Sequence, residues 1–325
     1  MKWEVSFDGG FWNNCGNTGT EVSINKSFSW GDEKWTVMAA YICKEGLVVD
    51  YSVEIDLEKF NAFLDKWDLR NGGYENLSRM EQEKIESEQP MNFGFRSSLV
   101  CNGKLLESCS GSSICWIPSS CQLAEGAQDT EPMYFINHYN LDENKAWVLW
   151  RCNYRWHQRE EQIKILEISF EREKKRYAVS PIGNLEKGRK AVVKHPITGE
   201  TYTVTALEVS NETYDESIFN NPALEYPTHF KAMSYSIEPE MEHNSFAIQD
   251  ASEGDSPRRR ERGVDGITSV SAISVFGGAR SVAAINTKKA QTACSSMHFD
   301  SEFEPDWMPV FFIKELDDIA VRIER

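Results

Sequence analysis

Residues 34–55 read KWTVMAAYICKEGLVVDYSVEI, two apolar runs that are joined through Lys44, Glu45 and Gly46. Valine, isoleucine, tyrosine and tryptophan, which strands favour, are frequent in both runs. A tight hairpin turn needs a residue with positive φ, and Gly46 stands at the connection. The stretch therefore predicts a β-hairpin and an antiparallel sheet in the first part of the chain.

Two further connections predict hairpins. Asn102 and Gly103 form a dipeptide that is typical of a two-residue hairpin turn. Residues 196–199 read PITG, with proline early and glycine late, which suits a turn between the apolar runs at 190–195 and 200–209. The polar stretch at 180–189 separates these runs from the first half of the chain.

Two segments have helical spacing. Large apolar residues recur every three or four positions over residues 57–67, directly after Asp56, a residue type that caps helix N-termini. Residues 78–88 predict a second helix, because Ser78 and Glu81 have the spacing of a capping box. This second segment is mostly charged, so we expect it on the surface.

The length of 325 residues indicates two domains, since one domain usually holds about 100–200 residues. We expect a β-rich domain at 1–182 with both helices, and a second β-rich domain at 183–325 with a mobile loop near 238–266. The predicted fold is mainly β: two antiparallel sandwich-like halves with one or two helices packed on the first.

The charge of the chain argues against polyanionic partners. Asp and Glu number 51 against 35 Lys and Arg, and the net charge is −16. Phosphate contacts need clustered cations, so we expect neither nonspecific nucleic-acid binding nor binding to an anionic membrane. The hydrophobic content of 40% is enough for a core, so the charge belongs to the surface of a folded protein.

The N-terminus reads MKWEVSFD, in which Trp3, Val5 and Phe7 alternate with polar residues. This pattern predicts a first strand and not the apolar core of a signal peptide. No run of about 18 apolar residues occurs that would span a membrane. We therefore expect a cytoplasmic protein with reduced thiols.

Four cysteines lie close together in the sequence: Cys101, Cys109, Cys115 and Cys121. Their spacings match none of the close C-x2-C to C-x4-C pairs of zinc sites. We interpret them as small apolar residues, with a metal or redox site as the alternative.

Six short segments together resemble a family of uncharacterised soluble proteins from anaerobic gut-type bacteria. They are residues 45–50 (EGLVVD), 62–67 (AFLDKW), 195–200 (HPITGE), 225–229 (EYPTH), 232–235 (AMSY) and 292–296 (TACSS). The resemblance implies a shared fold and no assigned activity.

Residues 273–285 read ISVFGGARSVAAI and are similar to the GGADGPT segment of the β subunit of sodium-pumping decarboxylases. In that family the aspartate is linked to sodium transport. Here Arg280 occupies the aspartate position, and Ser281 and Val282 occupy the Gly-Pro positions. A permanent cation in place of the carboxylate is incompatible with a sodium site.

No phosphate-binding or nucleophile motif is present. The chain contains neither G-x-G-x-x-G nor G-x-x-x-x-G-K-[ST], and it lacks the G-x-S-x-G elbow of hydrolases. We therefore expect no cofactor and no metal, and we assign no catalytic residue.

The strand predicted at 145–157 offers a candidate ligand face. Trp147, Arg151, Arg155 and His157 occupy alternate positions, so they share one side of the strand. An aromatic ring beside cations in an acidic protein suits a small anion or a sugar acid, while a ladder of surface salt bridges is the competing interpretation.

Arginines within the long polar segment form a second candidate: Arg258, Arg259, Arg260 and Arg262. They suit an interaction loop for an acidic partner, or a solvated loop that pairs with the protein's own carboxylates.

These observations support two hypotheses about function. The first is a soluble, non-catalytic binding or interaction protein with a protein partner or a small anionic or sugar ligand. The alternative is a hydrolase, for example one that acts on carbohydrate, whose acidic catalysts the sequence does not identify. A pocket with two carboxyl groups roughly 5–10 Å apart would favour the hydrolase.

Overall fold

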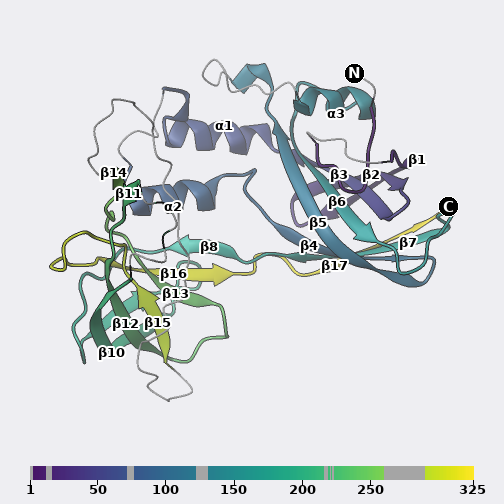
Figure 1. The fold of residues 1–325 in the computed structure, drawn as a ribbon. Helices are drawn as coiled ribbons and strands as arrows, with labels where there is room; N and C mark the ends of the chain where they lie inside the picture. The colour runs from purple at the N-terminus through teal and green to yellow at the C-terminus, as the bar shows by residue number, and fades with distance from the viewer. Residues whose placement is uncertain are drawn as a thin grey trace. The chain divides into compact units, whose positions relative to one another are not determined.

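The computed structural model describes residues 3–11, 17–71, 77–121, 131–215, 219, 221, 223–259 and 290–325. Antiparallel strands dominate, and the described residues contain three α-helices, so the predicted mainly β fold is confirmed (Figure 1). The chain divides into two compact units. The first comprises residues 1–76, 88–174 and 314–325, and the second comprises residues 77–87 and 175–313.

The first unit is built on one sheet of eight strands in the order β1-β2-β3-β6-β5-β4-β7-β17. The strands are β1 (Thr20–Trp30), β2 (Glu33–Ile42), β3 (Gly46–Ile55), β4 (Phe95–Cys101), β5 (Lys104–Trp116), β6 (Ala146–Arg155), β7 (Ile165–Arg172) and β17 (Ile319–Glu324). The unit also contains α1 (Leu57–Lys66), α3 (Glu131–Tyr139) and the short 3₁₀ helices η1 (Leu69–Asn71) and η2 (Ser119–Cys121).

The sheet curls until its two edge strands approach each other. The indole nitrogen of Trp30, at the end of β1, donates a 2.7 Å hydrogen bond to the carbonyl of Asp317, just before β17. Phe28 of β1 packs on Phe170 of β7 with ring centroids 5.3 Å apart. The concave side therefore encloses an aromatic core in which Trp35 and Tyr51 are fully buried.

The N-terminal segment covers the other side of the sheet together with α3. Val5 and Phe7 pack on Tyr41 and Val48, and Phe135 of α3 belongs to a second buried cluster on β5 and β6. The expected N-terminal strand is absent here: the segment forms one isolated bridge, between Ser6 and Thr18. Its alternating apolar residues cover a sheet face and extend no sheet.

The predicted hairpin is confirmed as β2 and β3, with Ile42 opposite Leu47. The role of Gly46 differs from the expected one, because its φ is not positive. A Cβ atom at this position would lie 2.1 Å from the carbonyl oxygen of Tyr154. Glycine is needed at this site for the close approach of β6.

The second unit is a sandwich of two antiparallel sheets, in the orders β15-β12-β10-β9 and β13-β16-β8, with a two-stranded β11-β14 pair. Its strands are β8 (Lys175–Ala178), β9 (Lys190–Lys194), β10 (Thr201–Thr213), β11 (Leu224–Glu225), β12 (His229–Glu238), β13 (Phe246–Asp250), β14 (Arg258–Arg259), β15 (Gln291–Cys294) and β16 (Trp307–Ile313). Tyr235, Trp307 and Phe311 are the largest fully buried side chains of the core between the sheets. Most of α2 (Arg79–Glu88) groups with this unit.

The unit boundaries differ from the expected domains. The main part of the second unit begins at Lys175, so the polar stretch at 180–189 lies inside it. Residues 314–325 belong to the first unit because β17 pairs with β7. Within the expected loop at 238–266, Phe246 and Ile248 are buried in β13, since they alternate toward the core; residues 260–266 lie outside the described part.

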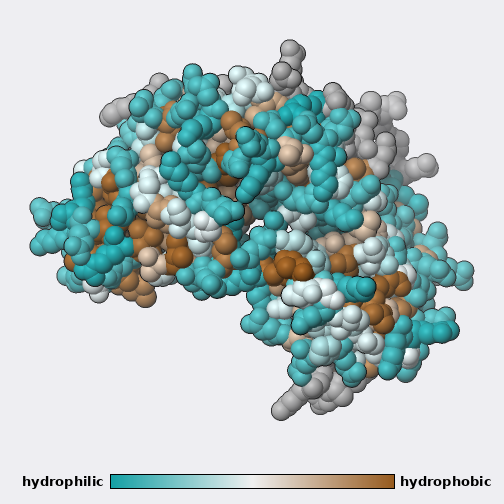
Figure 2. Space-filling view, turned by 180° about the vertical axis from the view of Figure 1, so that it is seen from behind, coloured by the Kyte–Doolittle hydropathy of each residue, from teal (hydrophilic) through white to brown (hydrophobic). Residues whose placement is uncertain are grey.

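The surface is mostly polar on the face shown in Figure 2, where hydrophobic residues form separate patches. No helix in the described part of the chain combines the length and the apolar character needed to cross a bilayer.

Candidate functional site

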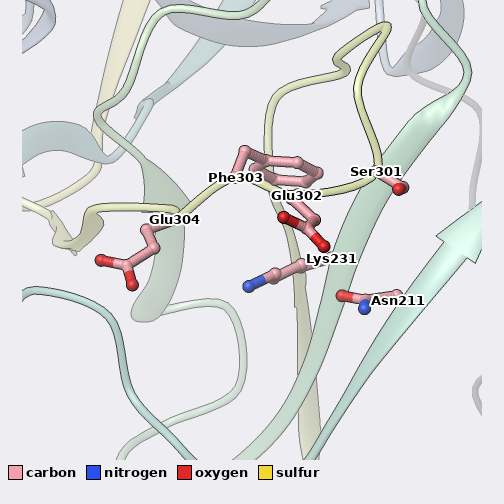
Figure 3. Close-up of a pocket in the computed structure, with 6 residues that line it drawn as sticks. All are labelled: Asn211, Lys231, Ser301, Glu302, Phe303 and Glu304. Atoms are coloured by element: carbon pink, nitrogen blue, oxygen red, sulfur yellow. The ribbon is translucent and has the colours of Figure 1, made fainter.

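The second unit carries an open pocket of about 400 Å³ (Figure 3). Two neighbouring strands and the loop before β16 supply one lysine, one amide, one hydroxyl, two carboxylates and one aromatic ring. The lining residues are Asn211 of β10, Lys231 of β12, and Ser301, Glu302, Phe303 and Glu304 of the loop.

A β-bulge decides which side chain of β10 reaches the pocket. Up to Ala206, the even-numbered residues of β10 face the core. The register with β12 then shifts by one residue, so the odd-numbered Val209 packs against the core, and Asn211, on the same face of the strand, is exposed at the pocket. Asn211 pairs in register with Lys231. The bulge therefore places an amide and an ammonium side by side on one face of the sheet, beyond the part of that face that packs in the core.

A buried carboxylate holds the loop at both ends. Asp250, only 5% exposed, accepts backbone N–H bonds from Ser296 at 2.8 Å and from Asp306 at 3.0 Å. It also accepts a 3.0 Å bond from the N–H of Ser252. Residues 301–304 lie between the two attached positions, so the segment that contains them is anchored at both ends within the protein.

Phe303 is the aromatic wall of the pocket. Its ring stacks on the imidazole of His298, with centroids 4.1 Å apart and an interplanar angle of 28°. On Lys231, the Nζ atom lies 5.5 Å from the centroid of the Phe303 ring. A cation over an aromatic face is weakly stabilised there, so the ring helps to position the ammonium.

The polar side chains of the pocket are otherwise uncommitted. Asn211, Lys231, Ser301, Glu302 and Glu304 make no side-chain hydrogen bond and no ion pair with any other residue that the structure describes. Figure 3 shows Lys231 extending beneath the Phe303 ring, with Asn211 and Glu304 on either side of it. Together these groups offer both donors and acceptors to a bound molecule.

The structure does not join the residues predicted on β6 into an external ligand face. Trp147 is buried in a core cluster, and its indole nitrogen donates to the carbonyl of Asp142 at 2.9 Å. Arg151 is 3% exposed, whereas Arg155 and His157 are exposed. Trp147, Arg151 and Arg155 alternate on β6 as expected, but the strand ends at Arg155 and His157 lies in the bend that follows. The N-terminal segment and α3 cover the half of this face that contains Trp147 and Arg151.

A buried hydrogen-bond network with Asp50 compensates the positive charge of Arg151. Its guanidinium binds both carboxylate oxygens of Asp50 at 2.8 Å, and Tyr139 donates to the same carboxylate at 2.8 Å. Burial alone would lower the pKa of Arg151, but the Asp50 carboxylate outweighs it and the pKa is raised. Burial, and then Asp50, hold the pKa of the Tyr139 phenol well above its ordinary value. The network is therefore ionic at Arg151 and neutral at Tyr139.

One residue of the predicted arginine loop, Arg258, forms an ion pair within the protein. Arg258 donates to Glu225 from Nε at 2.8 Å and from Nη2 at 3.2 Å. Its guanidinium also lies 4.1 Å from the centroid of the Phe299 ring. Arg259 is exposed in β14. Arg260 and Arg262 lie outside the described residues.

The cysteine group is split between environments. Cys101 and Cys121 are buried, whereas Cys109 and Cys115 are exposed. Burial raises the pKa of the Cys101 thiol to about 11, which disfavours a reactive thiolate at that position. In the described residues no group of three or more His, Cys, Asp or Glu is arranged to hold a metal ion.

The comparisons with known proteins give no relatives. No family model, curated protein or solved structure matches the chain. The segment that is similar to GGADGPT, residues 273–285, lies outside the described part. The residues of the chain itself are therefore the basis for any statement about function.

The sequence reasoning missed the pocket. Asn211, Lys231 and residues 301–304 come from three separate parts of the chain, and no motif links them. The bulge at Leu207 reverses the alternation of β10, so the sequence pattern alone places Asn211 on the wrong face. The charged face of β6 gives a stronger sequence signal, but no motif in the sequence links Arg151 to its buried partner Asp50.

Proposed function

We propose that the chain is a non-catalytic binding protein and that the pocket at Asn211 and Lys231 recognises a neutral polyhydroxylated ligand, such as one unit of a saccharide. The observation that carries the proposal is the set of five polar side chains that surround one open pocket without partners in the described residues.

The mixture of donors and acceptors favours hydroxyl groups. A hydroxyl donates one hydrogen bond and accepts others, so it is matched by a site that contains both kinds of group. Lys231 donates, Glu302 and Glu304 accept, and Asn211 and Ser301 do both. An anionic ligand would meet two carboxylates and one ammonium, so the charge balance disfavours it.

The site is suited to binding without large rearrangement. Asp250 fixes the backbone on both sides of residues 301–304, which lowers the entropy lost when a ligand binds. The volume of about 400 Å³ is within the range of small-molecule sites, roughly 300–1,000 Å³.

The test is a binding screen of neutral oligosaccharides by saturation-transfer NMR, followed by calorimetry on the hits. We expect Lys231→Gln and Asn211→Ala each to weaken binding by about tenfold, as loss of one hydrogen bond to a ligand does. Lys194→Gln, which changes an exposed lysine of the same unit, is the matched control. Absence of any hit, or equal affinity in all variants, would overturn the proposal.

Hydrolysis is the second candidate function, because the pocket contains the two carboxyl groups of Glu302 and Glu304. The same oligosaccharides serve to test it. Glycoside hydrolysis uses two carboxyl groups that flank the scissile bond. If the unmodified protein releases reducing ends and both Glu302→Gln and Glu304→Gln lose this activity, the protein is a hydrolase and the proposal of a non-catalytic binding protein is wrong. Bound but intact oligosaccharide supports the binding function.

A further inference from the structure

Strand β9 forms one edge of its sheet in the second unit, and within the described residues it pairs with β10 alone. Its burial alternates strictly. Lys190, Val192 and Lys194 are exposed, whereas Val193 is buried and Ala191 packs against the core. Val192 is 65% exposed, so its side chain is available to a partner.

The backbone of β9 has free hydrogen-bonding groups on its outer edge. The N–H of His195 donates to Glu200, and the carbonyl of Arg189 accepts from Ala206. In an antiparallel ladder every second residue bonds to the same neighbour. Ala191 and Val193, which alternate with these two ends, therefore bond to β10. The N–H and carbonyl groups of Lys190, Val192 and Lys194 point away from the sheet.

The same edge concentrates positive charge in a chain whose net charge is −16. Lys187 pairs with Glu208 at 3.2 Å. Arg189, Lys190 and Lys194 form no ion pair with any residue described in the structure. Three cations and the exposed Val192 thus lie along a strand edge that has no partner in the described part.

We propose that the β9 edge binds an extended acidic peptide segment of a partner protein, which adds to the sheet as a further strand. Backbone hydrogen bonds to the outward groups supply affinity, and alternate side chains supply specificity. In this arrangement, carboxylates of the peptide face Lys190 and Lys194, and an apolar side chain between them covers Val192.

The lysines of the β9 edge favour an acidic peptide as its partner over a second copy of the chain. Antiparallel pairing of two β9 edges about Val192 would place Lys190 of one copy opposite Lys194 of the other, and like charges directly opposite are destabilising. Edge lysines protect sheets against such self-association. An acidic strand turns the same two lysines into favourable contacts.

The experiment measures fluorescence anisotropy of a labelled peptide, Glu-Thr-Val-Thr-Glu, with the full chain. We expect saturable binding that weakens with added salt. The double variant Lys190→Glu/Lys194→Glu should weaken it by about tenfold, because two exposed ion pairs are lost. Circular dichroism and thermal melting check that this surface variant folds.

Three controls separate strand addition from general charge attraction. A peptide N-methylated at its central valine, which cannot donate to the edge, should bind at least about tenfold more weakly. A Lys-Thr-Val-Thr-Lys peptide should not bind, and a single-stranded DNA oligomer should not compete. Equal binding of the methylated peptide, binding of the lysine peptide, competition by DNA or full affinity in the double variant would each overturn the proposal. Lys231→Gln should leave peptide binding unchanged, so the test is independent of the saccharide pocket.

Discussion

The guanidinium of Arg151 binds the carboxylate of Asp50 through two parallel hydrogen bonds, Nε to Oδ1 and Nη2 to Oδ2, each 2.8 Å long. The two residues are cross-strand neighbours on β6 and β3, and both are almost fully buried. Arg151 also donates to the carbonyl of Gly10 at 3.2 Å. One ion pair therefore links the centre of the sheet to the N-terminal segment that covers it.

Replacing Asp50 by asparagine should be strongly destabilising. The change leaves the buried guanidinium of Arg151 without its counter-charge, and we expect the free energy of unfolding to fall by about 3–5 kcal/mol in urea denaturation. The double variant Asp50→Leu/Arg151→Met removes both charges and should recover much of this loss. Glu167→Gln, which breaks an exposed pair with Arg322, should change stability by less than about 1 kcal/mol. A similar small loss in Asp50→Asn would contradict the structural role assigned to this pair.

The cysteines should react with iodoacetamide in a defined order. Cys109 is exposed. Burial raises the pKa of Cys43 to about 11 and that of Cys152 to about 12, so at pH 8 their thiolate fractions are very small. We expect peptide mass spectrometry of the native protein to find Cys109 alkylated before Cys43 and Cys152. Denatured protein should lose this order, and early modification of Cys152 would show that the first unit opens readily.

Buried tyrosines should make the protein unstable in alkali. Burial raises the pKa of Tyr51 and Tyr154 above the ordinary value, which is about 10 in the unfolded chain. Above that pH the unfolded state loses these protons and the folded state keeps them, so stability is full below pH 10 and falls as pH rises. We expect the tyrosinate absorbance of these residues to appear together with the loss of circular dichroism. Its appearance in a fully folded protein would contradict their burial.

The contribution of the Asp56 N-cap of α1 to the free energy of unfolding should be measurable separately. The Asp56 carboxylate accepts from the N–H groups of Glu58 and Lys59 at 2.9 and 3.3 Å. Asp56→Ala should lower the free energy of unfolding by about 1 kcal/mol, and Asp56→Ser, which retains a capping oxygen, should lower it less. Equal losses in the two variants would assign the effect to charge and not to capping.

Features set by neighbouring residues were predictable from the sequence. The turn at Asn102 and Gly103 has positive φ at both positions and joins β4 to β5, as the dipeptide predicts. Gly199 likewise has positive φ between β9 and β10. Ser78 and Glu81 form the expected capping box at the start of α2. Each of these depends on interactions within a few residues.

Features set by distant contacts were not predictable. Helix α3 contains aromatic residues and Asn, which favour helices weakly, and its stability comes from packing Phe135 and Ile136 into a core cluster. The partnership of Asp50 with Arg151 depends on the register of β3 against β6, which a single sequence does not specify. The pocket at Lys231 requires a bulge and a loop that arrives from residues 301–304.

The last strand sets the order in which the molecule can be completed. β17 pairs with β7 in the first unit, yet residues 175–313 of the second unit are synthesised between them. A ribosome delivers the chain from its N-terminus, so the sheet of the first unit lacks its final strand until the whole sandwich has emerged. During that interval β7 presents an unpaired edge, and the second unit is complete before the first.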